Sequence, residues 1–311
     1  MENIIKIRNL SKNYGTVKAL DNVTLSVPKG SIFGYLGPNG AGKTTTLKIL
    51  MGLLQYSNGS VEIFENEVKK NPVAVNRRIG FLPDAEMPRN DSIYRFLNLT
   101  GKLHKIKNKE ERISEVLVQI GLKKLSNRKI GTLSKGQKQH VGIANALMVD
   151  PQLLILDEPN NGLDPIARVR VLTLLKDLVK NGKTVLLSSH IIGEVDKIAT
   201  DIAIIHRGRI VEQGKRKNLV KRYLNHGKYV IAGKLDIDQV MRSLEYITSC
   251  QQDHLERYII STTGNVTEEQ LLIDLIQKAN SKIQYFSSAE ISLEDLFIET
   301  INGQLKEGDY A

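Results

Sequence analysis

Residues 37 to 44 read Gly37-Pro38-Asn39-Gly40-Ala41-Gly42-Lys43-Thr44. This stretch fits the pattern G-x-x-x-x-G-K-[ST], whose glycines let the backbone curl so that its N–H groups point at phosphate oxygens. The lysine of the pattern brings a positive charge to the β- and γ-phosphates, and the hydroxyl residue binds Mg²⁺. The stretch therefore predicts binding of a nucleoside triphosphate together with magnesium.

The sequence on either side of this loop has the pattern that such a loop needs. Residues 31–36 form a short apolar run that predicts a buried strand, and residues 45–53 predict a helix. A helix that starts at the loop directs its positive dipole end at the phosphates. A chance glycine-rich turn is the alternative, but a chance turn needs neither the strand nor the helix.

Length and composition are those of a globular protein. The 311 residues suffice for one large domain or two, and the hydrophobic share of 41% is ordinary. No apolar run reaches the roughly 18 to 20 residues that span a bilayer, and residues 1–4 do not resemble the start of a secretory signal. A single cysteine, Cys250, excludes an intrachain disulfide and fits a reducing cytosol.

The net charge of +10 is spread along the chain with one local concentration. Within residues 207–222, seven lysines and arginines are opposed only by Glu212. Such a run is either a solvated face or a patch for anionic lipid or nucleic acid. Tyr223 is the one aromatic residue beside it, so the sequence gives little support to base stacking.

Hydrophobic spacing predicts an α/β fold. Alternating residues at 5–8 and 23–27 predict antiparallel strands ahead of the phosphate loop, and helical spacing from about 92 to 150 predicts a helical insertion. Apolar runs at 153–156 and 184–187 then predict buried parallel strands. The expected core is a mixed sheet that carries the loop and is interrupted by helices.

Beyond about Lys215 the pattern predicts a separate small α+β domain. Strands are expected at 228–235, 258–261 and 283–286, and helices at 237–246, 267–279 and 292–301. This order suggests a split βαββαβ arrangement in which one strand remains unassigned.

Polar residues that could carry chemistry lie at three places, two of them after predicted core strands and one at the start of a predicted helix. Asp157 and Glu158 come directly after the run at 153–156, where a carboxylate can hold Mg²⁺ and a second can orient an attacking water. His190 follows the strand predicted at 184–187, after Ser188 and Ser189, and Ser134 and Gly136 stand at the start of a predicted helix. Taken singly, the acidic pair could be an exposed turn, the histidine structural, and the serine a helix cap.

The order of these motifs resembles the ATPases of ABC transporters. The resemblance covers about residues 3–214 and includes the loop Asn161-Gly162-Leu163-Asp164. It implies a P-loop NTPase core at residues 1–214, with a helical subdomain at about 85–150, and an accessory domain at 215–311. Residues 292–297 are similar to the extension found on ATPases of the drug-, antibiotic- and lantibiotic-export branch.

The resemblance also implies a role for each site residue. Lys43 and Glu158 would be catalytic, with His190 at the γ-phosphate; Thr44 and Asp157 would hold Mg²⁺, directly or through water. Asp164 would lie at a contact between two subunits. The ATP-binding set would be Tyr14, stacked on adenine, with Gly37, Pro38, Asn39, Gly40, Ala41, Gly42, Lys43, Thr44 and Thr45. The signature segment, Ser134, Lys135, Gly136 and Gln137, would bind the ATP held by the opposite subunit.

The sequence departs from the family pattern at four positions. Asp84 stands where the family usually has a glutamine, and an ionised aspartate cannot donate a hydrogen bond. We therefore expect Asp84 to act in coupling to a membrane subunit, with a solvated turn as the alternative. Lys135 replaces a glycine, and we expect its side chain to point outward. His140 and Asn145 replace arginines, which predicts weaker local ion pairs.

The predicted function is that of an ATP-hydrolysing subunit that powers an ABC exporter of antibiotic peptides, drugs or lipids. The expected cofactors are ATP and Mg²⁺, and the expected partners are a transmembrane permease on a separate chain and a second ATPase subunit in an ATP-dependent homodimer. No nucleic acid is expected, and the expected location is the cytoplasmic face of the cell membrane.

Two other functions remain open at this stage. One is a non-transport ABC ATPase that acts on nucleic acid or ribosomes; such proteins usually carry two ATPase units or a long coiled-coil insertion, and the sequence shows neither. The other is a scaffold-type ABC ATPase of cofactor assembly, which lacks this C-terminal extension.

Overall fold

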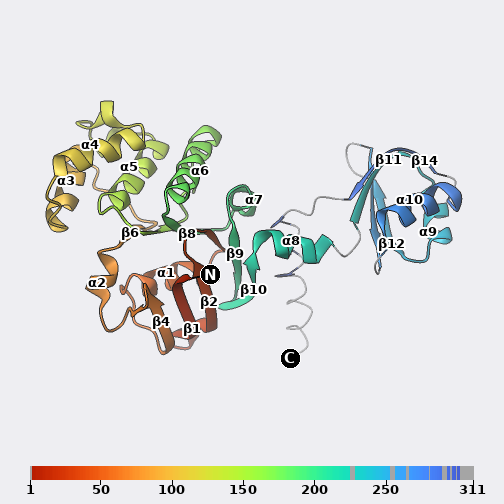
Figure 1. Cartoon of the computed structure of the whole chain (residues 1–311), viewed down its shortest axis with the longest axis horizontal. Coiled ribbons are helices and arrows are strands. Elements are labelled where there is room, and N and C mark those ends of the chain that lie inside the picture. Colours follow the sequence, from red (N-terminus) through yellow and green to blue (C-terminus); the bar gives the residue numbers. More distant parts are fainter. Residues whose placement is uncertain are drawn as a thin grey trace. The chain divides into compact units, whose positions relative to one another are not determined.

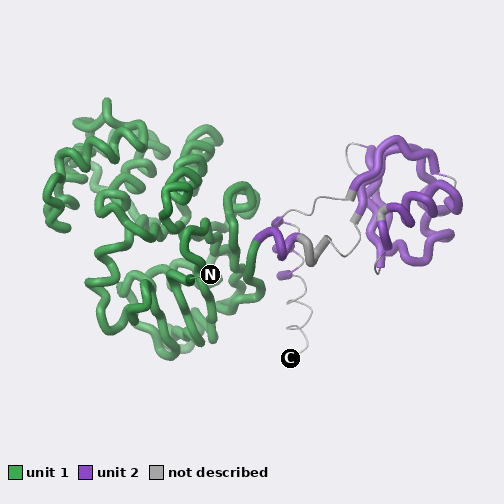
Figure 2. Tube along the Cα trace, in the orientation of Figure 1, with its two compact units in different colours: residues 1–215 green, residues 216–311 purple. Residues whose placement is uncertain are grey.

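The computed structural model describes residues 2–224, 228–252, 256–263, 266–279, 281–288, 293–294, 296–298 and 300–301. The chain forms two compact units, residues 1–215 and residues 216–311 (Figure 2). Each unit has its own buried hydrophobic cluster, so each is described by itself.

An antiparallel sheet at the start of unit 1 has the strand order β2-β1-β4-β5 (Figure 1). Its strands are β1 (Asn3–Tyr14), β2 (Val17–Pro28), β4 (Asn58–Ile63) and β5 (Asn66–Glu67). Ile5 and Ile7 are buried while Arg8 is exposed, as expected for strands with one face on a core. The turn between β1 and β2 places Gly15 at φ 57°.

The central sheet of unit 1 has the order β10-β9-β3-β8-β7-β6. Its strands are β3 (Ile32–Leu36), β6 (Ile79–Leu82), β7 (Leu153–Asp157), β8 (Thr184–Ser189), β9 (Asp201–His206) and β10 (Arg209–Lys215). The strands β3, β6, β7, β8 and β9 are parallel, and every residue of β3, β7 and β8 is buried. Because parallel strands end at the same edge, the segments that follow β3, β7 and β8 meet there.

Helices cover the central sheet and form the insertion. They are α1 (Lys43–Leu50), α2 (Pro72–Asn76), α3 (Ile93–Leu103), α4 (Lys109–Gln119), α5 (Lys135–Leu147), α6 (Pro165–Lys180) and α7 (Ile192–Asp196), with short 3₁₀ turns at Lys123–Leu125 and Ile130–Thr132. Leu47 and Leu50 of α1 share one buried cluster with Ile5 of β1 and Ile155 of β7, so α1 packs between the two sheets. Figure 1 shows α3, α4 and α5 grouped beyond β6, away from the antiparallel sheet.

The helix starts lie close to those that the sequence predicts. Ser134 caps α5 in a capping box with Gln137, and Asp164 caps α6, in which proline is the first residue. The helix after the phosphate loop begins at Lys43, two residues earlier than the predicted start.

Unit 2 contains a sheet of order β12-β13-β11-β14 preceded by α8 (Arg216–Leu224). The elements are β11 (Lys228–Lys234), α9 (Ile237–Ser243), β12 (Ile247–Gln252), β13 (Tyr258–Thr262), α10 (Glu268–Gln277) and β14 (Lys282–Ser288). This is the split βαββαβ order, and β12 is the strand that the sequence left unassigned. The predicted helix at 292–301, which includes the 292–297 segment, lies partly outside the described residues; its described positions are helical.

Candidate active site

The backbone of the phosphate loop requires glycine at particular positions. Gly40 and Gly42 have φ angles of 79° and 109°, which favour glycine. A Cβ on Gly42 would also lie 2.8 Å from the carbonyl oxygen of Ala19, and a Cβ on Gly37 would overlap the carbonyl oxygen of Ile205. The loop therefore fits closely between β2 and β9 and keeps its curled form.

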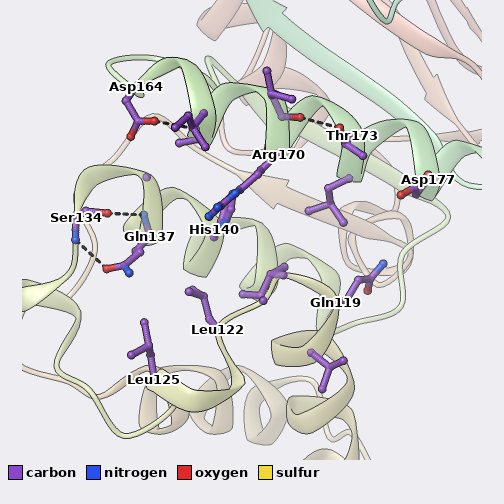
Figure 3. Close-up of a pocket in the computed structure, with 18 residues that line it drawn as sticks. Gln119, Leu122, Leu125, Ser134, Gln137, His140, Asp164, Arg170, Thr173 and Asp177 are labelled. Atoms are coloured by element: carbon purple, nitrogen blue, oxygen red, sulfur yellow. Dashed lines mark hydrogen bonds between the residues drawn. The ribbon is translucent and has the colours of Figure 1, made fainter.

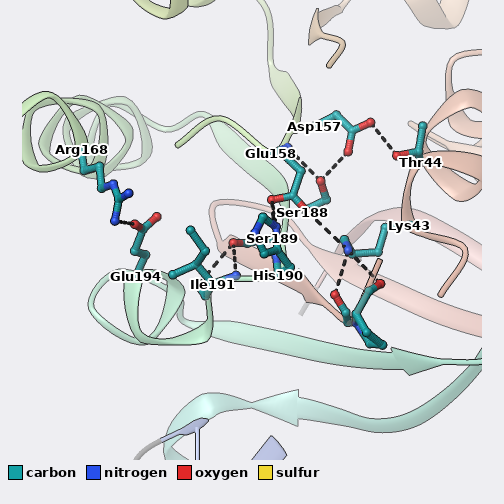
Figure 4. Close-up of polar contacts among 12 residues, drawn as sticks. Lys43, Thr44, Asp157, Glu158, Arg168, Ser188, Ser189, His190, Ile191 and Glu194 are labelled. Atoms are coloured by element: carbon teal, nitrogen blue, oxygen red, sulfur yellow. Dashed lines mark hydrogen bonds and ion pairs between the residues drawn. The ribbon is translucent and has the colours of Figure 1, made fainter. Parts of the chain in front are cut away.

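Lys43 lies inside the curl of this loop. Its side chain is 6% exposed, and its ammonium donates to the carbonyl oxygens of Gly37 at 2.7 Å and Pro38 at 3.2 Å. The same Nζ lies 3.4 Å from Oε1 of Glu158 (Figure 4). The cation is thus placed between the loop and the carboxylate that follows β7.

Thr44 and Asp157 are brought together from α1 and β7. The Thr44 hydroxyl donates to Oδ2 of Asp157 at 2.9 Å, and the Ser188 hydroxyl donates to Oδ1 of the same carboxylate at 2.6 Å (Figure 4). A hydroxyl and a carboxylate oxygen are ligands that suit Mg²⁺. The described residues contain no group of three or more His, Cys, Asp or Glu side chains placed to hold a metal ion. The pair fits an ion that takes its other ligands from water and phosphate, as Mg²⁺ commonly does.

Glu158 has an unusual backbone and a half-satisfied carboxylate. Its φ of 48° lies in the left-handed region, which is uncommon for residues other than glycine. Its N–H donates to the Ser188 hydroxyl at 3.0 Å. Its Oε2 lies 2.8 Å from Nδ1 of His190, and because an ionised carboxylate only accepts, Nδ1 is the donor. Its Oε1 is buried and has no hydrogen-bond partner among the described groups.

A cavity of about 480 Å³ joins most of the predicted ATP-binding residues. It is lined by Ala19, Asn39, Gly40, Gly42, Lys43, Thr44, Thr45, Asp84, Glu158, Asn161 and His190. We call it the nucleotide cavity. Tyr14 is not among the described residues that line this cavity. It is 49% exposed, and Lys12 Nζ lies 5.1 Å from the centre of its ring.

The signature segment faces a different cavity, of about 690 Å³, between α4, α5 and α6 (Figure 3). Ser134, Gly136, Gln137 and Asp164 line this signature cavity, which shares no lining residue with the nucleotide cavity. Ser134, Gly136 and Gln137 therefore border a different cavity from the phosphate loop of their own chain.

Lys135 lies elsewhere than its neighbours in the signature segment. Its Nζ is the atom that a Cβ on Gly162 would meet first, so the side chain lies against Gly162 of the same chain. Lys135 is exposed, which agrees with the expectation that its side chain points outward. Lys135 also lines a cavity of about 360 Å³ that reaches Asp84 and Glu158.

His140, which replaces an arginine of the family pattern, is 9% exposed and lines the signature cavity beside Arg170 (Figure 3). Burial, and secondarily the Arg170 charge, lower the pKa of His140 below its usual value. Asn145, the other replacement, accepts a hydrogen bond from the Thr100 hydroxyl at 2.5 Å. Both positions are filled by groups that the structure accommodates without a charge.

Asp84 borders the nucleotide cavity as well as the 360 Å³ cavity, which is also lined by residues 85–87 and Arg89. The predicted coupling residue is thus also a neighbour of Glu158. Sequence reasoning gave Ser188 no role, although this residue connects Asp157 and Glu158. The register of β7 and β8 pairs Asp157 with Ser188, and no local motif encodes that pairing.

A strand, a glycine-rich loop and a helix that together hold Lys43 and Thr44 beside an acidic strand end define a P-loop nucleoside triphosphatase. The chain belongs to the ABC transporter family of ATP-binding proteins, and residues 20–161 match the model of that family, ABC transporter. It is therefore an ATPase, as the sequence predicted, and the predicted family and fold class are confirmed.

The chain is similar along its length to the bacitracin transport ATP-binding protein BcrA of Bacillus licheniformis. The two are 34% identical over 312 residues, which cover 97% of this chain and 99% of that protein. The lantibiotic transport ATP-binding protein SrtF of Streptococcus pyogenes is 36% identical over 208 residues, 67% of this chain and 89% of that protein. These matches give no support to the nucleic-acid alternative.

Solved ATP-binding cassettes share the fold of the ATPase region. The structure of an ATP-binding subunit of an ABC transporter has a TM-score of 0.65 at 27% identity, over 71% of this chain and 93% of that chain. A dimeric cassette in a post-hydrolysis state with bound ADP and Pi has a TM-score of 0.62 at 27% identity, over 68% and 98%. None of the helices in the described ranges is long and apolar enough to cross a membrane.

Proposed function

We propose that this chain hydrolyses ATP to power the export of antibiotic peptides, drugs or lipids. It would act at the cytoplasmic face of the membrane through a transmembrane permease on a separate chain. The full-length similarity to a bacitracin transport ATP-binding protein supports the export assignment. The accessory unit, residues 216–311, is included in that similarity because the match covers 97% of the chain.

The observation that carries the hydrolytic role is the geometry of Glu158. One carboxylate oxygen is fixed by His190 at 2.8 Å, and the other is buried, free of hydrogen bonds, and beside the nucleotide cavity. A free carboxylate oxygen at that place is suited to accept a proton from an attacking water. Lys43 lies 3.4 Å from it and would move its charge to the phosphates when a nucleotide enters.

The other residues have binding roles in this proposal. Thr44 and Asp157 would hold Mg²⁺, which neutralises charge on the phosphates when bound. His190 would contact the γ-phosphate, and the loop N–H groups from Gly37 to Thr45 would surround the phosphates. Tyr14, exposed beside Lys12, would stack on adenine. Asp84 would act in coupling to the permease.

A second copy of the chain would complete each site. The signature cavity and the nucleotide cavity share no lining residue, so Ser134, Gly136 and Gln137 of one copy are free to face the nucleotide of the other. Lys135, whose Nζ lies at Gly162 of its own chain, would approach the same nucleotide from beside that glycine. Asp164 would lie at that contact. The similarity to a solved dimeric cassette supports this arrangement.

Two substitutions test the hydrolytic role separately. Lys43→Ala is expected to weaken ATP binding, because it removes the positive charge that would lie beside the phosphates. Glu158→Gln is expected to keep ATP binding and to slow turnover by about 100-fold or more. Binding is measured with a fluorescent ATP analogue and turnover by phosphate release. The control is Glu111→Gln, at an exposed carboxylate on α4. Full turnover by Glu158→Gln would remove Glu158 from the catalytic role.

The export role is tested by producing this chain together with a candidate transmembrane permease on a separate chain. Co-expression in a sensitive strain is expected to raise resistance to a peptide antibiotic such as bacitracin, and Glu158→Gln is expected to abolish the gain. A chain that hydrolyses ATP but changes neither resistance nor efflux with its permease would contradict the export assignment alone.

A further inference from the structure

Arg168 of α6 contacts two segments that both border the candidate site. Its Nε donates to the carbonyl oxygen of Leu163 at 2.8 Å, and its NH1 lies 2.9 Å from Oε1 of Glu194 on α7. Leu163 directly precedes Asp164, which lines the signature cavity. Glu194 lies four residues after His190 (Figure 4). One guanidinium thus connects residues 160–164 with the helix that follows His190.

Glu194 is buried more deeply than an ordinary surface partner. Its side chain is 10% exposed, against 35% for Arg168. Neither of its carboxylate oxygens has an aligned hydrogen bond among the described groups, so the contact with Arg168 is one of charge. A buried carboxylate without its cation is strongly destabilising. Glu194 therefore stays where Arg168 is, and α7 is held with it.

The position of α7 bears directly on His190. The Ser189 hydroxyl accepts a hydrogen bond from the N–H of Ile191 at 2.9 Å, which closes the turn between β8 and α7. His190 stands inside this turn and reaches Glu158 through Nδ1. A shift of α7 would therefore move the imidazole relative to the carboxylate.

The other end of the connection lies at the proposed subunit contact. Leu163 is 3% exposed, and its N–H donates to the carbonyl oxygen of Asn160 at 3.2 Å, so residues 160–164 form a packed turn. Arg168 fixes the carbonyl of this turn from the side of α6. Neither Arg168 nor Glu194 is among the described residues that line the nucleotide cavity. An effect of this pair on the site would therefore be indirect.

We propose that Arg168 and Glu194 are positioning residues that link the subunit contact at residues 160–164 to His190. A second copy bound at Asp164 fixes the position of the adjacent Leu163 carbonyl. Arg168, which donates to that carbonyl, and Glu194, which pairs with Arg168, then fix the position of α7 and so of the His190 imidazole. The inference rests on the proposed function, because it requires an ATP-dependent dimer.

The test separates positioning from simple stability. Glu194→Gln keeps the shape of the side chain and removes its charge, so the chain is expected to fold and bind ATP within about threefold of the unmodified chain. Its kcat is expected to fall by about 10-fold to 100-fold, because a small misplacement of a catalytic group such as His190 slows the reaction by this much. Arg168→Met leaves the buried Glu194 carboxylate without its cation and is expected to lower the denaturation midpoint. The double variant Arg168→Met/Glu194→Gln removes both charges and is expected to restore the midpoint without restoring kcat.

The controls and the dimer assay use the full chain. Asp274 of α10 is also a buried carboxylate in an ion pair, 5% exposed and 3.0 Å from Lys278, in the unit that holds no predicted site residue; it also accepts a hydrogen bond from the Tyr246 hydroxyl. Asp274→Asn and Lys278→Met are expected to change the midpoint but leave kcat within twofold. In a Glu158→Gln background, Glu194→Gln is expected to leave less ATP-dependent dimer by size-exclusion chromatography.

Two outcomes overturn the inference while leaving the proposed function intact. One is a Glu194→Gln chain with kcat and dimerisation within twofold of the unmodified chain. The other is a double variant that regains kcat together with its midpoint, which would make the pair purely structural. If the unmodified chain does not hydrolyse ATP, by contrast, the proposed function is overturned and this inference with it.

Discussion

Replacing Ser188 by alanine is expected to impair both stability and turnover, because one hydroxyl serves both acidic residues of the site. Ser188 is fully buried, donates to Asp157 at 2.6 Å and accepts from the Glu158 N–H at 3.0 Å. Ser188→Ala leaves both groups without this partner, and each buried unsatisfied group costs about 1–3 kcal/mol. Since the Glu158 N–H is only partly buried, we expect the free energy of unfolding to fall by about 2–4 kcal/mol.

The same substitution should separate kcat from KM. The left-handed backbone of Glu158 would lose the hydrogen bond that holds it, so kcat is expected to fall by about 10-fold to 100-fold. Asp157 keeps its bond to Thr44, so KM for ATP should change by less than about threefold.

Urea denaturation and phosphate release measure the two effects of Ser188→Ala. Thr184→Val is the matched control, because Thr184 is also fully buried on β8 but lies at the other end of the strand, where its hydroxyl accepts from the N–H of Gly30. The reasoning is refuted if Ser188→Ala keeps kcat within about threefold and stability within about 0.5 kcal/mol of the unmodified chain, the range of neutral substitutions.

The signature cavity and Asp84 give further expectations. With ATP, Glu158→Gln should elute as a dimer and Glu158→Gln/Ser134→Arg as a monomer; a strict monomer that hydrolyses ATP would contradict the two-copy site. Because burial lowers the pKa of His140, the unfolded chain binds more protons as pH falls through 6.5, so the unfolding free energy should fall there. The loss should be steeper than in His140→Gln by up to about 1.4 kcal/mol per pH unit, and equal slopes in chemical denaturation would refute it. Asp84→Ala should lower substrate-stimulated turnover with the permease more than turnover of the isolated subunit; equal losses would place Asp84 in the catalytic centre.

Local patterns in the sequence account for the parts of the site that lie within one segment. The loop from Gly37 to Thr44 has its glycines where the backbone is left-handed or packed against another strand. Ser134 was recognisable as a helix cap, because a cap needs only its own next three residues. These features depend on short-range chemistry, so one sequence is enough to predict them.

Features that depend on register or on distant pairing could not be predicted in this way. The bond between Ser188 and Asp157 arises because β7 and β8 place these residues opposite each other. The pair of Arg168 and Glu194 joins residues 26 positions apart in the sequence. β12 was missed because its residues are mostly polar and half-exposed, as at an edge strand, so they give no apolar alternation.

The local energetics of the chain single out Glu158 independently of its motif. Among the described residues, it alone combines a left-handed backbone with a buried side-chain oxygen that accepts no hydrogen bond. A strained backbone of this kind costs about 1–3 kcal/mol. Burying an oxygen without a hydrogen bond adds to this cost, and the charge of Lys43, 3.4 Å from Oε1, offsets part of it. Such features persist only where the surroundings hold them, and here Ser188 holds the N–H while His190 holds one carboxylate oxygen. These free-energy costs therefore arise at Glu158, the residue that the sequence pattern assigns to hydrolysis. They leave free the one oxygen that a water-activating carboxylate needs.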